Sequence, residues 1–217
     1  MIPLAKNVGF SAANNVGLMN SNGDLVAFVN PDVHVLPAEL PILAHAIATT
    51  GGIVSPQLLN PDGSRQPNGR GLPFLVDKFG HRGVNIRGAR PDLYLPAEEP
   101  RDLQPVAWTI GAVVAGSRTS INRMGGWNER FFLYYEDHDF GLRAWRSGLS
   151  VHLVNNVHWV HDWQRETIKF AWSPWRREVA SALKFYSLYP GLLFETSRRR
   201  KKLALKYGVH IATEPMK

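Results

Sequence analysis

Residues 131–143 read FFLYYEDHDFGLR: four aromatic residues and a leucine run directly into a glutamate, two aspartates and a histidine. The carboxylates predict the first turn of a helix, where the helix dipole favours negative charge. Gly148 is the type of residue that ends such a helix. The other apolar and polar segments of the chain can be arranged around this acidic helix.

The helical pattern separates the carboxylates by face. Glu136 shares one side with Asp139 and Arg143, and these last two have the four-residue spacing of an ion pair. Asp137 lies on the other side with Phe140, and we expect that side to face the protein. A carboxylate among aromatic rings is costly unless it has a partner or a task. From this segment alone, an acidic helix start with one exposed ion pair is as good an interpretation as a catalytic carboxylate.

The composition limits the class of protein. The 217 residues are 44% hydrophobic, which suits one domain with a core and leaves room for a small appendage. The absence of cysteine excludes disulfides and thiolate metal sites. No apolar run reaches the roughly 18 residues of a membrane span, and the segment after Met1 lacks the apolar core of a signal peptide.

The formal net charge is +7, and part of the excess is concentrated in RRRKK at 198–202. Such a cluster can contact nucleic acid, anionic lipid or only solvent. Basic and aromatic residues are not interleaved on one surface, so we do not expect nucleic-acid binding. P-loop, Rossmann glycine, zinc-protease and nucleophile-elbow patterns are absent.

Apolar runs predict the strands of an α/β protein, at 25–29, 53–59, 106–115 and 151–161. The first run, LVAFV, has the character of a buried parallel strand. Asp32 would then follow the carboxyl end of a central strand, where α/β sheets bind ligands, although aspartate is also a common turn residue. Gly111 interrupts the third run, which indicates a bulge or the close approach of a ligand.

Helices are predicted at 37–49, from 176 to 190 and at 192–207. In the second of these, Val179, Ala182, Leu183 and Tyr186 form the apolar stripe. The glycine- and proline-rich interval 64–101 predicts a long functional or mobile excursion with a short helix near 75–79. His158 and His161 point to opposite faces of an extended chain, so we do not expect them to bind the same ion.

The ordered motifs are specific as a set. They are NVGFSAANN (7–15), FVNPDV (28–33), PDGSRQ (61–66), WTIGAVV (108–114), GGWNERFFLYYEDHDFGLRAWRSG (125–148) and His161. This set resembles family 2 glycosyltransferases, in particular the rhamnosyltransferase-like branch that builds cell-surface polysaccharides. The resemblance extends from Asn7 to about Tyr186. It implies a GT-A fold, a mixed α/β sheet flanked by helices, followed here by C-terminal helices.

The resemblance also implies a reaction. A sugar, by this likeness rhamnose from a thymidine diphosphate donor, would move with inversion from a nucleotide-diphosphate donor to a polysaccharide or lipid-linked acceptor. Asp137 matches the catalytic base, and Glu136 would hold the acceptor or orient that base. Asp32 matches the ligand of the divalent cation, Mg²⁺ or Mn²⁺, on the donor diphosphate. His161 would complete the metal site or cap the pocket as a structural residue. The other substrate-binding assignments are Trp108, Gly111, Ala112 and Asn15, although amides such as that of Asn15 are often helix caps.

One departure from the family pattern concerns the beginning of the chain. Members of the family have a strand, a helix and a strand that hold the nucleoside before the segment matching Asn7, whereas here Met1 lies shortly before it. We therefore expect an N-terminally truncated GT-A-like domain at 1–165 and a basic helical extension at 166–217. A misplaced start, a fragment or a second polypeptide supplying that half would each explain this departure. We also expect this chain to bind donor poorly and turn over slowly.

Three functional hypotheses remain. The first is an inverting transferase in the cytoplasm, peripheral at the inner face of the membrane, with the basic helix touching lipid. The second is a catalytically impaired module that binds a sugar or a partner transferase. The third, a nucleic-acid binder, rests on charge alone and ranks last.

Overall fold

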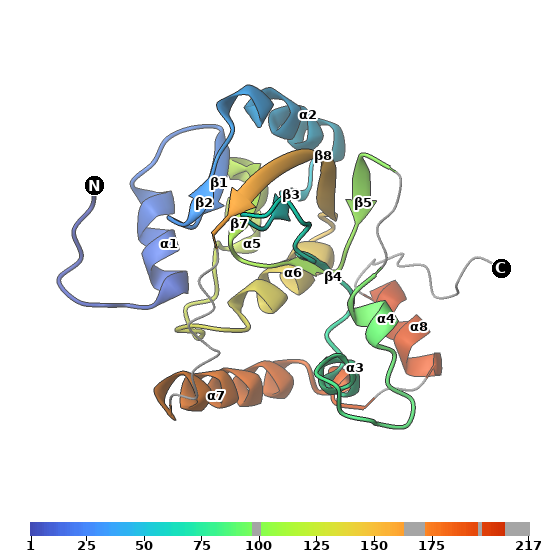
Figure 1. The fold of residues 1–217 in the computed structure, drawn as a ribbon. Helices are drawn as coiled ribbons and strands as arrows, with labels where there is room; N and C mark the ends of the chain where they lie inside the picture. Colours follow the sequence, from blue (N-terminus) through green and yellow to red (C-terminus); the bar gives the residue numbers. More distant parts are fainter. Residues whose placement is uncertain (97–100, 163–171, 195–196, 207–217) are drawn as a thin grey trace.

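A computed structural model describes residues 1–96, 101–162, 172–194 and 197–206 (Figure 1). A mixed sheet runs through the middle of the molecule. In spatial order its strands are β1 (Leu25–Val29), β7 (Val113–Ser117), β3 (Ile53–Leu59), β8 (Val151–His161) and β2 (Val33–His34), and β5 (Leu103–Pro105) also pairs with β8. The β3–β8 pairing is parallel and the other pairings are antiparallel. β4 (Gly69–Arg70) and β6 (Trp108–Thr109) form a separate two-stranded sheet.

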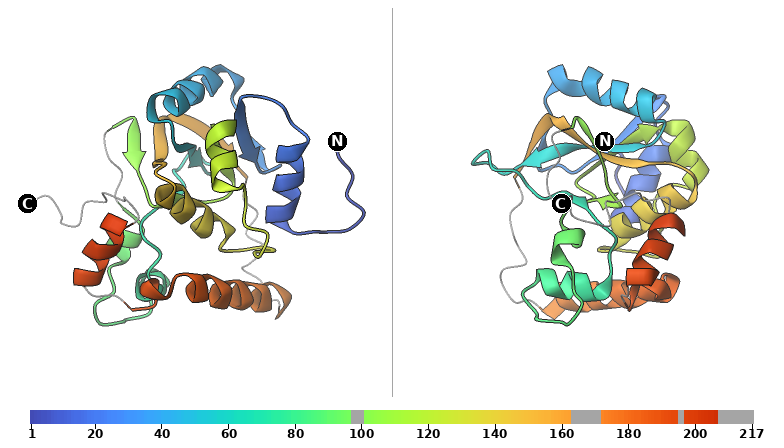
Figure 2. Two further views of the ribbon diagram at one scale, coloured as in Figure 1. Left: turned by 180° about the vertical axis from the view of Figure 1, so that it is seen from behind. Right: turned by 90° about the vertical axis from the view of Figure 1, so that its right-hand side faces the viewer.

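The alternation of side chains along the strands builds a core on each face of the sheet. Val54, Ala115 and Val154 pack with α2 (Leu40–Thr50), which follows the short 3₁₀ helix η1 (Pro37–Glu39). The neighbouring residues Ile53, Val114 and Leu153 pack on the opposite face. That face is covered by α1 (Phe10–Met19), α5 (Arg118–Met124) and α6 (Glu136–Arg146). The views in Figure 2 show α2 on one side of the sheet and α6 on the other.

A third cluster joins the C-terminal helices to the acidic segment. Its helices are α3 (Leu75–His81), α4 (Pro91–Tyr94), α7 (Trp172–Leu188), η3 (Pro190–Leu192) and α8 (Ser197–Lys206). Phe185 and Tyr189 are buried in one cluster with Trp108, Phe131 and Tyr135. The C-terminal helices therefore pack directly behind the segment that carries the carboxylates. The division at residues 165 and 166 stays a prediction, and residues 163–171 lie outside the described part of the chain.

Several expected elements are confirmed. β3 spans the run expected at 53–59, α2 follows the pattern expected at 37–49, and α3 is the short helix expected near 75–79. The run expected as one strand at 106–115 is instead divided between two strands, β6 and β7, which lie on either side of Gly111 and belong to different sheets. The interval 64–101 also contains β4 and α4, which the sequence pattern did not predict.

The environment predicted for β1 is wrong. Instead of a buried parallel strand, β1 is antiparallel to β7 and lies at the edge of the sheet in the described part of the chain. Val26 and Phe28 face the core, whereas Leu25 is 49% exposed and Val29 is 37% exposed. A short apolar run cannot by itself distinguish a strand covered on both faces from a strand covered on one face. Asp32 therefore follows an edge strand.

The inward face predicted for α7 is also corrected. Of the predicted stripe, Tyr186 is buried and Ala182 packs against the same cluster, but Leu183 is 70% exposed and Val179 is 48% exposed. Phe185 and Tyr189, outside the stripe, are buried. Aromatic rings bury more area than aliphatic side chains, and here they determine which side of the helix faces the core.

The predicted ion pair of Asp139 exists but is not exposed. Its carboxylate, 2% exposed, accepts from Arg143 Nε at 2.6 Å and from Tyr189 Oη at 2.8 Å.

Candidate active site

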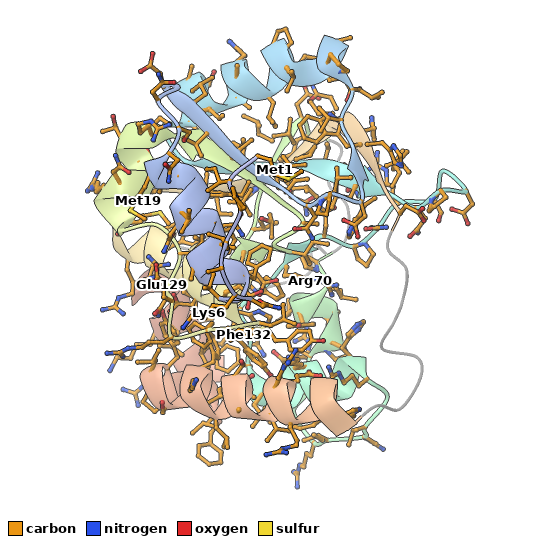
Figure 3. The ribbon with its side chains drawn as sticks, turned by 90° about the vertical axis from the view of Figure 1, so that its left-hand side faces the viewer. Met1, Lys6, Met19, Arg70, Glu129 and Phe132 are labelled. Carbon is orange, nitrogen blue, oxygen red and sulfur yellow. The ribbon has the colours of Figure 1, made fainter. Side chains whose placement is uncertain are left out.

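A pocket of about 830 Å³ opens where the loop after β1, the loop before β7, the start of α6 and the end of β8 meet. Six of the eight residues singled out from the sequence line it, namely Asp32, Gly111, Ala112, Glu136, Asp137 and His161. Asp32 and Asp137, which are distant from each other in the sequence, thus line the same cavity. Figure 3 shows Arg70, which also lines this pocket, between the sheet and α7.

The backbone before α6 aims the carboxylates into this pocket. Tyr134 and Tyr135 both have left-handed conformations, with φ of 71° and 68°. Such a conformation costs a non-glycine residue about 1–2 kcal/mol, so the surrounding packing must hold it. Tyr135 is buried in the aromatic cluster, and Ser181 on α7 donates a hydrogen bond to the Leu133 carbonyl at 2.7 Å. This strained turn sets the direction in which α6 begins.

Gly141 lets α6 lie close to β6. A Cβ added at this position would be 2.6 Å from the Ala107 carbonyl oxygen and would also collide with Trp108. The helix can therefore approach the strand only because residue 141 lacks a side chain. This close packing fixes the position of α6 relative to the pocket.

Asp137 is held in the ionised form. Its carboxylate accepts hydrogen bonds from the Gly111 amide at 3.3 Å, from the His138 amide at 2.8 Å and from His138 Nδ1 at 2.7 Å. Burial opposes ionisation, but His138 and the backbone donors outweigh it and lower the pKa of Asp137. An ionised carboxylate facing a pocket can accept a proton from a substrate hydroxyl.

His138 supports Asp137 and does not enter the pocket. Its ring stacks on Trp108 with centroids 3.6 Å apart, and burial lowers the pKa of His138 to about 4. At neutral pH the ring is therefore neutral and carries one N–H, which Nδ1 donates to Asp137. Trp108 also donates Nε1–H to the Gly71 carbonyl at 2.9 Å. The structure thus places Trp108 behind the carboxylate and outside the pocket lining.

Glu136 differs from its neighbour because it is 6% exposed and its Oε2 has no hydrogen-bond partner among the described residues. Burial raises the pKa of Glu136 to about 8, and the charge of Asp137 contributes to the shift. Since the two carboxyl groups are adjacent, they titrate as a coupled pair. At neutral pH the pair holds a single negative charge, located on Asp137.

Replacing Glu136 with Gln is expected to remove a pH dependence of stability. Between pH 4.5 and about 8 the native protein retains a proton on Glu136 that the unfolded chain releases. The contribution of Glu136 therefore makes the free energy of unfolding fall as pH rises through that interval. Chemical denaturation across this range should give a flatter profile for Glu136→Gln than for the wild type. Parallel profiles for the two proteins would contradict the assignment.

Asp32 and His161 meet on another side of the pocket. The pairing of β2 with β8 brings them together, and His161 Nε2 lies 3.5 Å from Asp32 Oδ1. Gln66 Nε2 donates to the Asn60 side chain and to the His161 carbonyl, so Gln66 Oε1 is the atom that accepts from His161 Nδ1, at 2.9 Å. The proton on Nδ1 leaves Nε2 with a lone pair directed toward Asp32.

This arrangement fits a divalent cation. Asp32 Oδ1 is buried without a hydrogen-bond partner among the described residues, and burial lowers the pKa of His161, which keeps its ring neutral. Two electron-pair donors that face each other favour a cation between them. No group of three or more His, Cys, Asp or Glu side chains in the described ranges is placed to hold a metal ion. Further oxygen ligands of such a cation can come from a substrate, from water or from amide groups.

Asn15 lies outside the pocket lining. Its side chain accepts from the Trp127 amide at 2.8 Å and donates to the Trp127 carbonyl and to Glu129. It thereby fastens α1 to the turn before the acidic segment.

Three residues of the site were not predicted from the sequence, namely Gln66, Arg70 and His138. Gln66 lies in the PDGSRQ motif and His138 lies in the acidic block, so the motifs contain both residues although nothing in their spacing indicates a role.

With this geometry established, the family is also clear. Residues 1–123, more than half of the chain, match the model of Glycosyl transferase family 2. The chain belongs to this family.

Two curated relatives are similar over most of this chain. The N-acetylglucosaminyl-diphospho-decaprenol L-rhamnosyltransferase of Mycobacterium tuberculosis is 29% identical over 175 residues, which are 70% of this chain and 55% of that protein. The low-salt glycan biosynthesis hexosyltransferase Agl10 of Haloferax volcanii is 28% identical over 172 residues, 76% of this chain and 52% of the relative. The chain thus spans about half the length of these relatives.

Solved structures confirm the fold. GalNAc-T7 with UDP, GalNAc and Mn²⁺ superposes with a TM-score of 0.56 at 12% identity, over 94% of this chain and 42% of that one. S. aureus TarS gives a TM-score of 0.51 at 12% identity, over 94% and 31% of the two chains. The mixed sheet flanked by helices is therefore a GT-A fold, as the sequence predicted.

Proposed function

We propose that this chain catalyses the inverting transfer of a sugar from a nucleotide-diphosphate donor to a lipid-linked or polysaccharide acceptor. The observation that carries the proposal is the meeting of ionised Asp137 with the Asp32–His161 pair in one pocket. The relatives named as a rhamnosyltransferase and a hexosyltransferase support a hexose-type sugar, with rhamnose as the specific expectation. The lipid diphosphate in the name of the mycobacterial relative supports a lipid-linked acceptor.

The proposed reaction uses the two sides of the pocket for different tasks. Asp137 takes the proton of an acceptor hydroxyl, whose oxygen bonds to the anomeric carbon as the bond from that carbon to the diphosphate breaks. The nucleoside diphosphate leaves with the electron pair, and attack from the opposite side inverts the centre. Asp32 and His161 would hold Mg²⁺ or Mn²⁺, which offsets the charge that builds on the leaving diphosphate. Gly111 keeps Asp137 oriented through its amide.

Contact with the inner face of the membrane is part of the proposal. No helix in the described ranges is long and apolar enough to cross a bilayer. Arg198, Lys201 and Lys202 are exposed on α8, and such side chains attract anionic lipid. Arg200 is not available for this task because it is buried and pairs with Asp77. The basic surface of α8 is therefore smaller than RRRKK suggests.

Metal-dependent binding of a nucleoside diphosphate tests the proposed function. We expect calorimetric titration of UDP or TDP to show tighter binding with Mn²⁺ than with EDTA. Asp32→Ala should weaken the Mn²⁺-dependent binding by about 10- to 100-fold, because it removes a ligand of the cation. Asp24→Ala, an exposed change on the preceding loop, is the matched control. Equal binding with Mn²⁺ and with EDTA would contradict the metal site. Tight binding without any sugar transfer would favour the non-catalytic module.

A further inference from the structure

The lining of the pocket is divided by charge. Asp32 and His161 occupy the side built by β2 and β8, where His161 Nε2 lies 3.5 Å from Asp32 Oδ1. Arg70 from β4 and His81 from the end of α3 line another side, and the charge of Arg70 acts on His81 and on Asp137. No ion pair links Arg70 to Asp137 among the interactions of the described residues. The pocket thus has a cationic side that the proposed chemistry has not used.

Ring packing holds Arg70 in place, and no hydrogen bond of its side chain is found within the described ranges. β4 pairs with β6 so that Arg70 lies opposite Trp108, and the guanidinium carbon is 5.5 Å from the centre of the Tyr94 ring. Arg70 Nε is buried and has no hydrogen-bond partner in the described part of the chain. Leaving a buried donor of a charged group unsatisfied is costly. A guanidinium stays charged at neutral pH, so an anionic ligand would satisfy this donor.

His81 adds a second donor at the same side. The His81 ring packs against the Tyr94 ring with centroids 5.6 Å apart, and His81 is an exposed residue. Burial lowers the pKa of His81, with the charges of Arg70 and Arg82 acting in the same direction. A neutral imidazole still has one N–H to donate. A nearby phosphate would favour the charged ring and make the pair a stronger anion site.

We propose that Arg70 and His81 bind the phosphate of a lipid-linked acceptor, so that the base Asp137 lies between two anion sites. This inference rests on the proposed function and names the acceptor class. The donor diphosphate is assigned to the cation held by Asp32 and His161, whereas arginine binds phosphate directly through its planar fork of donors. An acceptor hydroxyl must lie beside Asp137, and an anion next to that hydroxyl would lie on the Arg70 side. A neutral polysaccharide acceptor would leave this side without a ligand.

The test measures binding without turnover and without metal. Geranyl diphosphate, a short prenyl diphosphate, is titrated calorimetrically in EDTA, and geraniol serves as the uncharged probe. We expect the wild-type protein to bind geranyl diphosphate and not geraniol. Arg70→Gln should weaken this binding about tenfold or more, the effect of one charge-assisted hydrogen bond. His81→Gln should weaken it less. Arg123→Gln, an exposed arginine on α5 outside the pocket lining, should leave it unchanged.

The outcomes separate this inference from the proposed function. Both Arg70→Gln and His81→Gln should retain Mn²⁺-dependent binding of UDP or TDP, since neither residue belongs to the metal pair. Loss of nucleotide binding with geranyl diphosphate binding intact would place Arg70 on the donor side and overturn the inference. Equal binding of geranyl diphosphate by the wild type and both variants would overturn it as well. Absence of nucleotide binding in the wild type would instead count against the proposed function alone.

Discussion

Replacing Asp137 with Asn is expected to lower the rate of sugar transfer by about 10²- to 10⁴-fold, the usual contribution of a general base. The single amide oxygen of Asn can take the place of Oδ1 and accept from the His138 amide and ring, and only the longer bond from the Gly111 amide to Oδ2 is lost. The local structure should therefore persist. It cannot take a proton from the acceptor. Nucleotide binding should therefore stay close to the wild-type value while the catalytic rate falls.

The Asp137 variant is assayed with radiolabelled nucleotide-sugar donor and lipid extract as acceptor, alongside calorimetric nucleotide binding. Asp24→Asn is the matched control, because it makes the same chemical change at an exposed position. Unchanged transfer by Asp137→Asn would show that another group takes the proton. A loss of binding equal to the loss of rate would assign Asp137 to substrate holding instead of proton transfer.

Replacing Arg200 with Met is expected to lower the free energy of unfolding by about 3–5 kcal/mol, the usual effect of breaking a buried ion pair. Arg200 Nη2 lies 2.6 Å from Asp77 Oδ2, and the Asp77 side chain is fully buried. Asp77 Oδ1 also accepts from the Arg90 amide at 2.7 Å, but this neutral donor does not replace the charge of Arg200 beside a buried carboxylate. The guanidinium also lies over the Phe74 ring, so packing is lost as well.

The control for Arg200→Met is a substitution on the same helix. Arg198→Met removes an exposed arginine two positions earlier and should change the free energy of unfolding by less than about 0.5 kcal/mol. Denaturant titration followed by tryptophan fluorescence measures both variants. If both substitutions destabilised the protein equally, the Asp77–Arg200 ion pair would not be what holds α8 in place.

The sequence predicted the parts of the fold that depend on local periodicity. The pattern of α2, the limits of β3 and the acidic start of α6 follow from residue order within each segment. Helical spacing predicted that Asp137 faces the protein, and it lines the pocket, but Glu136, predicted on the other side of α6, is buried and lines the same pocket. Asp32 and Asp137 were placed in one site by the family resemblance, and their common pocket agrees with it.

The remaining features depend on contacts between distant segments. Whether β1 is covered on one face or two is decided by its neighbours, and no periodicity within five residues contains that information. Arg200 was read as part of a solvated basic cluster, yet Asp77 draws it into the interior. Arg70 lies in a polar interval that has no periodic pattern, and only the pairing of β4 with β6 brings it to the pocket.

The two left-handed tyrosines before α6 create a conflict for thermostabilisation of this protein. Glycine at position 135 would suit the backbone, but it would remove a ring from the aromatic packing around Phe185. Any other side chain keeps the unfavourable φ and fits that packing less well. Selection for heat resistance should therefore spare this turn and accumulate its gains on the far side of the sheet, around α2.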